Sequence, residues 1–160
     1  MKAIACACVL AVFAFHIARA ENDPLPKNLR AFAGNTWVGP YHVELEGDTV
    51  LYWRGGPKDK KHAEKIKPTK ASWQAFRREL DAINIWRWRP DYSTRSIMDA
   101  TAWIFEVEYL DRKIKTGGDR GLFPDKTGAP IPLDAPHSED QYMRYVHALQ
   151  KLIGSEKFPN

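Results

Sequence analysis

The residue types best suited to ligand binding lie in the run from Trp86 to Arg89, where tryptophan and arginine alternate. This period of two predicts a short strand over residues 85–89, with both indole rings on one face and both guanidinium groups on the other. Exposed indoles beside arginines can stack on sugars or bases, worth about 1–3 kcal/mol for each stacked base. The favoured alternative is that the indoles enter the core and the arginines pair with Glu106 and Glu108 on a neighbouring strand.

A second set of chemically capable side chains is His42, Glu44 and Glu46, which share one face of a predicted strand. An imidazole with two carboxylates is a possible ligand set for zinc or manganese. Alternate residues of a single strand spread along a row instead of converging on one point. A solvated hairpin face is therefore the favoured interpretation, and the sequence predicts neither a metal site nor a cofactor.

Nucleophilic catalysis finds little support in the residue pattern. No serine lies in a Gly-x-Ser-x-Gly elbow, and no glycine-rich phosphate loop runs directly into a predicted helix. The two cysteines, Cys6 and Cys8, both fall in the N-terminal apolar run. No catalytic residue is assigned, and binding is favoured over catalysis. The enzyme alternative is a small envelope hydrolase that uses Asp99 with a histidine or an acid brought near by the fold.

The first 20 residues have the pattern of a secretory signal peptide. Lys2 precedes an apolar run from Ala3 to Ile17, and small residues at 18 and 20 place a cleavage site after Ala20. The apolar run is shorter than the about 20 residues that a membrane span needs, so no span is expected after cleavage. We expect export to the periplasm or to the extracellular medium.

The charge balance gives a weak indication of the partner. The chain of 160 residues has 24 Lys and Arg against 20 Asp and Glu, a net charge of +4. Loss of Lys2 and Arg19 with the signal peptide lowers this charge to +2. Nucleic-acid modules usually concentrate positive charge on one face, and export also disfavours nucleic acid. The expected partner is another envelope protein or a cell-wall glycan.

Periodicity predicts the elements that position these residues. Alternation around a Gly47-Asp48 turn predicts a hairpin over residues 42–53, followed by a charged loop over 58–67. Apolar residues at helical spacing from Trp73 to Ile83 predict a helix that begins after Thr69. The remaining predicted elements are a strand over 103–109, a partner strand over 113–116, an irregular stretch over 120–137, and a last helix opened by a capping box at 138–141 and ended by Gly154.

These elements predict an α+β fold, an antiparallel sheet of hairpins with two helices packed on one face. The expected organisation is a signal peptide over 1–20, a lead-in segment over 21–35, a single α+β domain over 36–154 and a C-terminal tail over 155–160. A mature chain of about 140 residues can bury a sufficient core without disulfides.

The order of the aromatic markers is similar to a known pattern. A Trp-x-Trp run is followed by Tyr92, Asp99 and a strand led by Trp103, then by a basic strand and a Gly-rich loop. From about Ser72 to Ile153 the chain resembles a group of small uncharacterised bacterial exported proteins. The resemblance implies the α+β fold and an envelope context, and it carries no activity over. Its marker residues are Trp86, Trp88, Tyr92, Asp99 and Trp103.

We therefore expect a non-catalytic binding or interaction module. A carbohydrate-binding module is the second alternative, and it requires at least two coplanar aromatic rings exposed on one face. The expected binding surface is the open face of the sheet, with Arg87, Arg89 and Glu106 in its middle, or alternatively the loop at 117–123 at its edge. Its candidate residues are Trp86, Arg87, Trp88, Arg89, Asp99 and Glu106.

Overall fold

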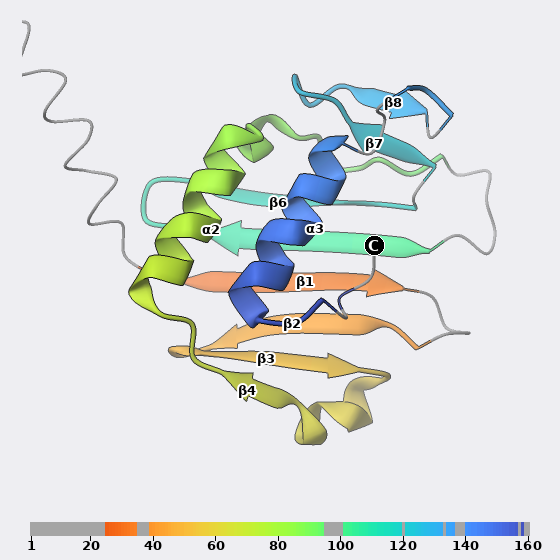
Figure 1. The fold of residues 1–160 in the computed structure, drawn as a ribbon. Helices are drawn as coiled ribbons and strands as arrows, with labels where there is room; N and C mark the ends of the chain where they lie inside the picture. Colours follow the sequence, from red (N-terminus) through yellow and green to blue (C-terminus); the bar gives the residue numbers. More distant parts are fainter. Residues whose placement is uncertain are drawn as a thin grey trace, which may run out of the picture.

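The computed structural model describes residues 25–34, 39–94, 101–119, 121–132, 134–136, 140–156 and 158. Within them, a six-stranded antiparallel sheet has the order β4-β3-β2-β1-β5-β6, and helices α2 and α3 lie side by side across one of its faces (Figure 1). The predicted α+β fold is confirmed. The strands of the sheet are β1 (Asn28–Gly34), β2 (Tyr41–Glu46), β3 (Thr49–Arg54), β4 (Glu64–Ile66), β5 (Ala102–Glu108) and β6 (Lys113–Gly118).

The other elements cover or flank this sheet. The helices are α2 (Lys70–Ala82) and α3 (Asp140–Ile153), and the 3-10 segments are η1 (Pro57–His62) and η2 (Ile85–Arg87). A separate two-stranded sheet pairs β7 (Leu122–Pro124) with β8 (Pro130–Pro132). Regular structure therefore occurs in both stretches that were predicted to be loops, residues 58–67 and 120–137.

Strand β1 corrects the expectation of a lead-in segment before residue 36. It lies inside the sheet, between β2 and β5, and pairs with both of them. Leu29, Ala31 and Ala33 alternate along it and are buried beneath the helices. Two of these three side chains are alanines, which are only weakly hydrophobic. The sequence pattern of β1 is therefore weak, although its buried and less buried positions alternate regularly.

The two predicted hairpins are confirmed. Strands β2 and β3 pair from Tyr41 with Arg54 to Glu46 with Thr49. Gly47 has φ +63° in the turn between them, a left-handed conformation that glycine adopts without a steric penalty. Strands β5 and β6 form the second hairpin, which continues through Gly118 instead of ending at residue 116.

Both predicted helices are confirmed. Thr69 caps α2, because its hydroxyl accepts a hydrogen bond from the Ser72 N–H at 3.1 Å. Gly154 follows α3 with φ +64°, the left-handed conformation typical of a helix C-terminus. Ser138, the first residue of the predicted capping box, lies outside the described residues. No helix in the described part of the chain has the length and apolarity needed to cross a membrane.

The strand predicted over residues 85–89 is wrong. Asn84 has φ +53°, and the N–H groups of Arg87 and Trp88 donate to Asn84 O and Ile85 O at 3.1 and 2.9 Å. The segment therefore winds as a 3-10 turn with about three residues per turn. Trp86 and Trp88 consequently point in different directions, which the period-two interpretation did not allow.

Aromatic side chains form much of the core between the sheet and the helices. Trp103 and Phe105 of β5 contact Tyr142 and Tyr145 of α3 with ring centroids 5.2 and 4.6 Å apart. Trp88 packs edge-on against Trp103 at 6.2 Å. These tilted and edge-to-face arrangements are the ones that aromatic quadrupoles favour.

Candidate binding groove

The described structure has a groove of about 640 Å³ between α2 and α3, the two helices seen side by side in Figure 1. This volume is in the range of typical ligand sites, about 300–1,000 Å³. The residues that line it are Ser72, Ala75, Phe76, Arg78, Glu79 and Ala82 from α2, and Arg144, His147, Ala148, Lys151 and Leu152 from α3.

Helical periodicity places these residues along one seam. On α3, Arg144, His147 and Lys151 are spaced i, i+3 and i+7, so they form a row along the side of the buried stripe. On α2, Ala75 and Ala82 are exposed, whereas Phe76 beside them is buried. Small side chains on the rim and buried apolar side chains at the base therefore create the hollow.

The groove carries a surplus of positive charge. Its lining includes three permanent cations, Arg78, Arg144 and Lys151, against a single acid, Glu79. Arg144 and Glu79 pair across the groove, with the guanidinium nitrogens Nε and Nη2 at 2.7 and 2.6 Å from Glu79 Oε1. Arg78 and Lys151 are exposed and form no ion pair with another described residue. The groove can therefore offer two cations, one on each helix, to an anionic ligand.

The candidate arginines of the Trp86–Arg89 run lie elsewhere. Arg87 and Arg89 are exposed, but neither lies in the sheet, so neither pairs with Glu106 or Glu108 as expected. Glu106 does lie on the open face of the sheet, where its carboxylate is 2.7 Å from Lys115 Nζ on β6. Asp99 lies outside the described residues. The structure thus does not bring the described candidate residues together into one surface.

The two tryptophans of the run have different environments. Trp88 is only 5% exposed and belongs to the core. Trp86 is partly buried, and its indole N–H donates to Asp81 Oδ1 at 2.6 Å. Its ring contacts the guanidinium groups of Arg77 and Arg112, whose Cζ atoms are 5.0 and 5.3 Å from the ring centroid. Trp86 is therefore part of a polar network and not a free stacking platform.

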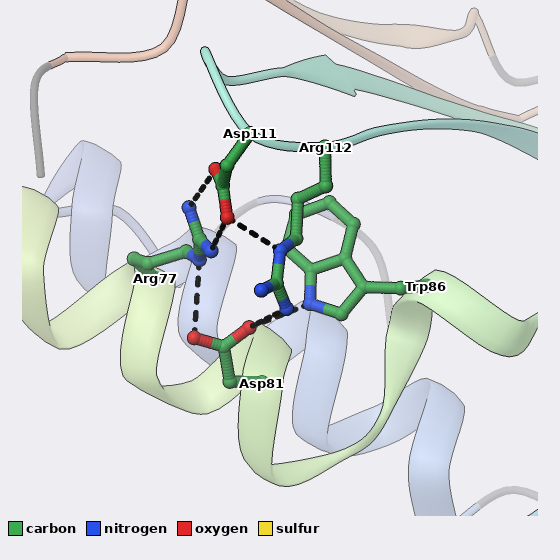
Figure 2. A network of polar contacts seen from close by, with 5 residues as sticks. All are labelled: Arg77, Asp81, Trp86, Asp111 and Arg112. Carbon is green, nitrogen blue, oxygen red and sulfur yellow. Dashed lines mark hydrogen bonds and ion pairs between the residues drawn. The ribbon is translucent and has the colours of Figure 1, made fainter. Parts of the chain in front are cut away.

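Figure 2 shows this network, which joins α2 to the β5–β6 turn. Arg77 of α2 is 6% exposed, and its guanidinium donates to both carboxylate oxygens of Asp111 at 3.2 and 3.0 Å. It also donates to Asp81 at 3.1 Å. Arg112 completes the ring of contacts, at 2.7 Å from Asp111 and 3.3 Å from Asp81. The Arg77 and Arg112 hydrogen bonds lower the pKa of Asp111 to about 2.

The histidine and acids considered as metal ligands lie on the open face of the sheet. His42 stacks on Trp53 with ring centroids 4.5 Å apart, and its Nε2 is 3.0 Å from Gly55 O. Burial lowers the pKa of this histidine. Glu44 and Glu46 both pair with Lys60, at 2.6 and 2.8 Å. These contacts fit the solvated hairpin face that the sequence favoured.

The loop proposed at the edge of the sheet, residues 117–123, is held by structural contacts. Asp119 accepts hydrogen bonds from the N–H and hydroxyl of Thr94 at 2.7 and 2.9 Å, and from the Gly121 N–H at 2.9 Å. Phe123 is fully buried. The carboxylate of Asp119 is therefore already bonded, to Gly121 within the loop and to Thr94 outside it.

Sequence reasoning missed the groove residues Arg78, Arg144 and Lys151. It placed His147 at the edge of the buried stripe of the last helix, which agrees with its exposed position on the groove. The sequence does indicate a row of these residues on one side of the last helix, because Arg144, His147 and Lys151 are spaced i, i+3 and i+7. The pairing of that row with α2 depends on tertiary packing.

No protein-family model matches this chain, and no curated protein matches it.

Proposed function

We propose that the protein is an exported binding module of the bacterial envelope, and that its α2–α3 groove binds an acidic segment of a partner protein. The observation that carries the proposal is the groove itself, a concave site with apolar side chains at its base and cations on both rims. Charge complementarity across an interface steers association and selects partners. Export remains the inference from the N-terminal residue pattern.

The aromatic environments favour a protein partner over a glycan. Sugar binding was expected to need two coplanar rings exposed on one face. Trp88 and Trp103 are 5% and 1% exposed, and the partly buried ring of Trp86 is contacted by two guanidinium groups. Within the groove the aromatic residue is Phe76, which is 2% exposed. A stacking platform for a sugar ring is therefore missing from the groove and from the Trp86–Arg89 run.

The groove also favours binding over hydrolysis. Ser72 is the hydroxyl side chain among its lining residues. Its Oγ lies 2.9 Å from Thr69 Oγ1, and its N–H donates to the same atom, so the serine is part of the N-terminal cap of α2. A serine in that position contributes to helix stability, and the groove cations remain available for binding.

A charge reversal on both rims tests the proposal. The test variant combines Arg78→Glu with Lys151→Glu, and the control combines Lys61→Glu with Lys126→Glu, which makes the same change in net charge at exposed sites outside the groove. Fluorescein-labelled poly-L-glutamate is titrated with each protein, and binding is followed by fluorescence anisotropy. Circular dichroism checks that each variant is folded.

We expect the groove variant to bind poly-L-glutamate at least ~10-fold more weakly than the parent chain, which corresponds to about 1.4 kcal/mol. The control variant should lose less than ~3-fold, because charges far from a bound ligand are screened over about 10 Å at 0.1 M salt. Equal losses in the two variants would show that net charge alone attracts the polyanion. That result would refute a binding site in the groove.

A further inference from the structure

The shape of the α2–α3 groove restricts the conformation of its occupant. Both walls are helices, whose backbone N–H and C=O groups are satisfied within each helix except at the ends. The walls therefore offer main-chain partners to a ligand only near the helix ends, unlike the edge of a β-sheet. An extended peptide in this groove would leave backbone groups facing apolar side chains without hydrogen bonds. Such unpaired groups cost about 1–3 kcal/mol each.

A helical occupant avoids this cost because it satisfies its own backbone. The groove also suits the close approach of a third helix, since Ala75, Ala82 and Ala148 contribute small side chains to it. Phe76 and Leu152 add apolar contact surface at the base, although each is nearly buried. A helix with small apolar residues along one stripe could pack against this surface by ordinary helix packing.

The charges on the rims indicate what flanks that stripe. Lys151 and His147 are one turn apart on α3, and Arg78 is on the opposite wall. Arg144 is already paired with Glu79. Lys151 and Arg78 are therefore the cations that remain for the ligand. Acidic residues on both sides of the apolar stripe would meet Lys151 on one rim and Arg78 on the other.

We infer that the ligand of the groove is an amphipathic helix of a partner protein, with a stripe of small apolar residues flanked on both sides by Asp or Glu. This inference rests on the proposed function, because it specifies the conformation of the acidic segment that the groove binds. A disordered acidic segment or a simple polyanion would satisfy the charges but would not use the helical walls.

Three peptides of equal length and equal net charge test the conformation. The patterned peptide has about five turns of helix, with alanine and leucine at i, i+3, i+4 and i+7 and glutamate on both flanks. A scrambled isomer distributes the same residues around the helix. A third peptide keeps the pattern but exchanges two alanines in its centre for prolines, which prevents a continuous helix. Binding to the full chain is measured by anisotropy, and the helicity of each mixture is measured by circular dichroism.

Substitutions in the groove test the location. Ala75→Trp places a large side chain on the groove wall, whereas Ala71→Trp makes the same change at an exposed position of α2 that does not line the groove. Both sites are exposed on the surface of the helix, so both variants should fold. Ala75→Trp should weaken binding of the patterned peptide at least ~10-fold, and Ala71→Trp should leave it within ~2-fold.

The outcomes separate this inference from the proposed function. Tighter binding of the patterned peptide than of the other two, with a gain of helicity and sensitivity to Ala75→Trp, would support the inference. If all three peptides bind equally well, and if the combined Arg78→Glu and Lys151→Glu variant binds them more weakly, the helical conformation of the ligand is overturned. The proposal of an acidic ligand in the groove is then retained. If neither the charge reversal nor Ala75→Trp weakens binding of the peptides, both proposals are overturned. Both are also overturned if neither poly-L-glutamate nor any of the peptides binds.

Discussion

Replacing Asp111 by asparagine should weaken the fold in a manner that depends on pH. Arg77, nearly buried, donates two hydrogen bonds to this carboxylate, and Arg112 donates a third (Figure 2). These contacts hold the pKa of Asp111 at about 2, against an ordinary value of 3.8. Each pKa unit corresponds to about 1.4 kcal/mol, so the unscreened contribution is roughly 2.5 kcal/mol.

Solvent reduces this contribution. The Asp111 side chain is 39% exposed, and exposed ion pairs contribute about 0–1 kcal/mol. We therefore expect Asp111→Asn to lower the free energy of unfolding by about 1 kcal/mol at neutral pH. Because the native pKa lies below the unfolded one, the contribution is present above about pH 4 and is lost as the pH falls towards 2. The difference between parent and variant should therefore shrink across that interval.

Urea unfolding followed by tryptophan fluorescence measures this difference. The parent chain, Asp111→Asn and the control Asp134→Asn are compared at pH values from about 7 down to about 2.5, and the free energies are extrapolated to water. Asp134 is exposed and forms no ion pair with another described residue, so its substitution should have little effect. A difference for Asp111→Asn that is equally large at both ends of the pH range would refute an origin in the carboxylate charge, as would its absence at neutral pH.

Three further substitutions test contacts that hold the fold. Arg77→Lys should lower the free energy of unfolding by about 2 kcal/mol in urea titrations, because an ammonium group cannot form the planar two-pronged contact of a guanidinium; a loss below about 0.5 kcal/mol would contradict this role. Tyr92→Phe removes a hydroxyl that donates to Gly128 O at 2.7 Å and accepts from the Arg89 N–H at 2.8 Å. It should cost about 1–3 kcal/mol, and an unchanged thermal midpoint would count against that estimate. Gly128→Ala should lower the free energy of unfolding by more than about 1 kcal/mol, because Gly128 has φ +85° and an added Cβ would lie 2.4 Å from Arg87 O. Hydrogen exchange in β7 and β8 should also accelerate. Unaltered exchange together with unaltered stability would show that the backbone adapts.

The elements that the sequence predicted well depend on local patterns. The stripe from Trp73 to Leu80 and the cap at Thr69 define α2 within one stretch of chain. The alternation from Trp103 to Tyr109 similarly identifies β5, whose odd-numbered residues are buried. In both cases the apolar period agrees with the face that the element buries.

The failures arise where tertiary contacts override a short or weak pattern. Alternation over the five residues 85–89 resembled a strand, but the left-handed conformation of Asn84 starts a 3-10 turn there. In β1 the small side chains of Ala31 and Ala33 gave little hydrophobic contrast, although pairing with strands on both sides buries them. The groove could not be predicted, because it exists only where α2 and α3 meet.

The position of β1 inside the sheet has a consequence for the growing chain. Its neighbour β2 follows within a few residues, but its other neighbour, β5, ends 74 residues after Gly34, at Glu108. At a synthesis rate of about 5–20 residues per second, β1 waits roughly 4–15 s for that partner. During this interval the strand presents an open hydrogen-bonding edge beside apolar side chains, a hazard for association with other chains. A chaperone that holds the chain until β5 has emerged would prevent association during this interval. The interior location of β1 therefore predicts a delay between its synthesis and its folding.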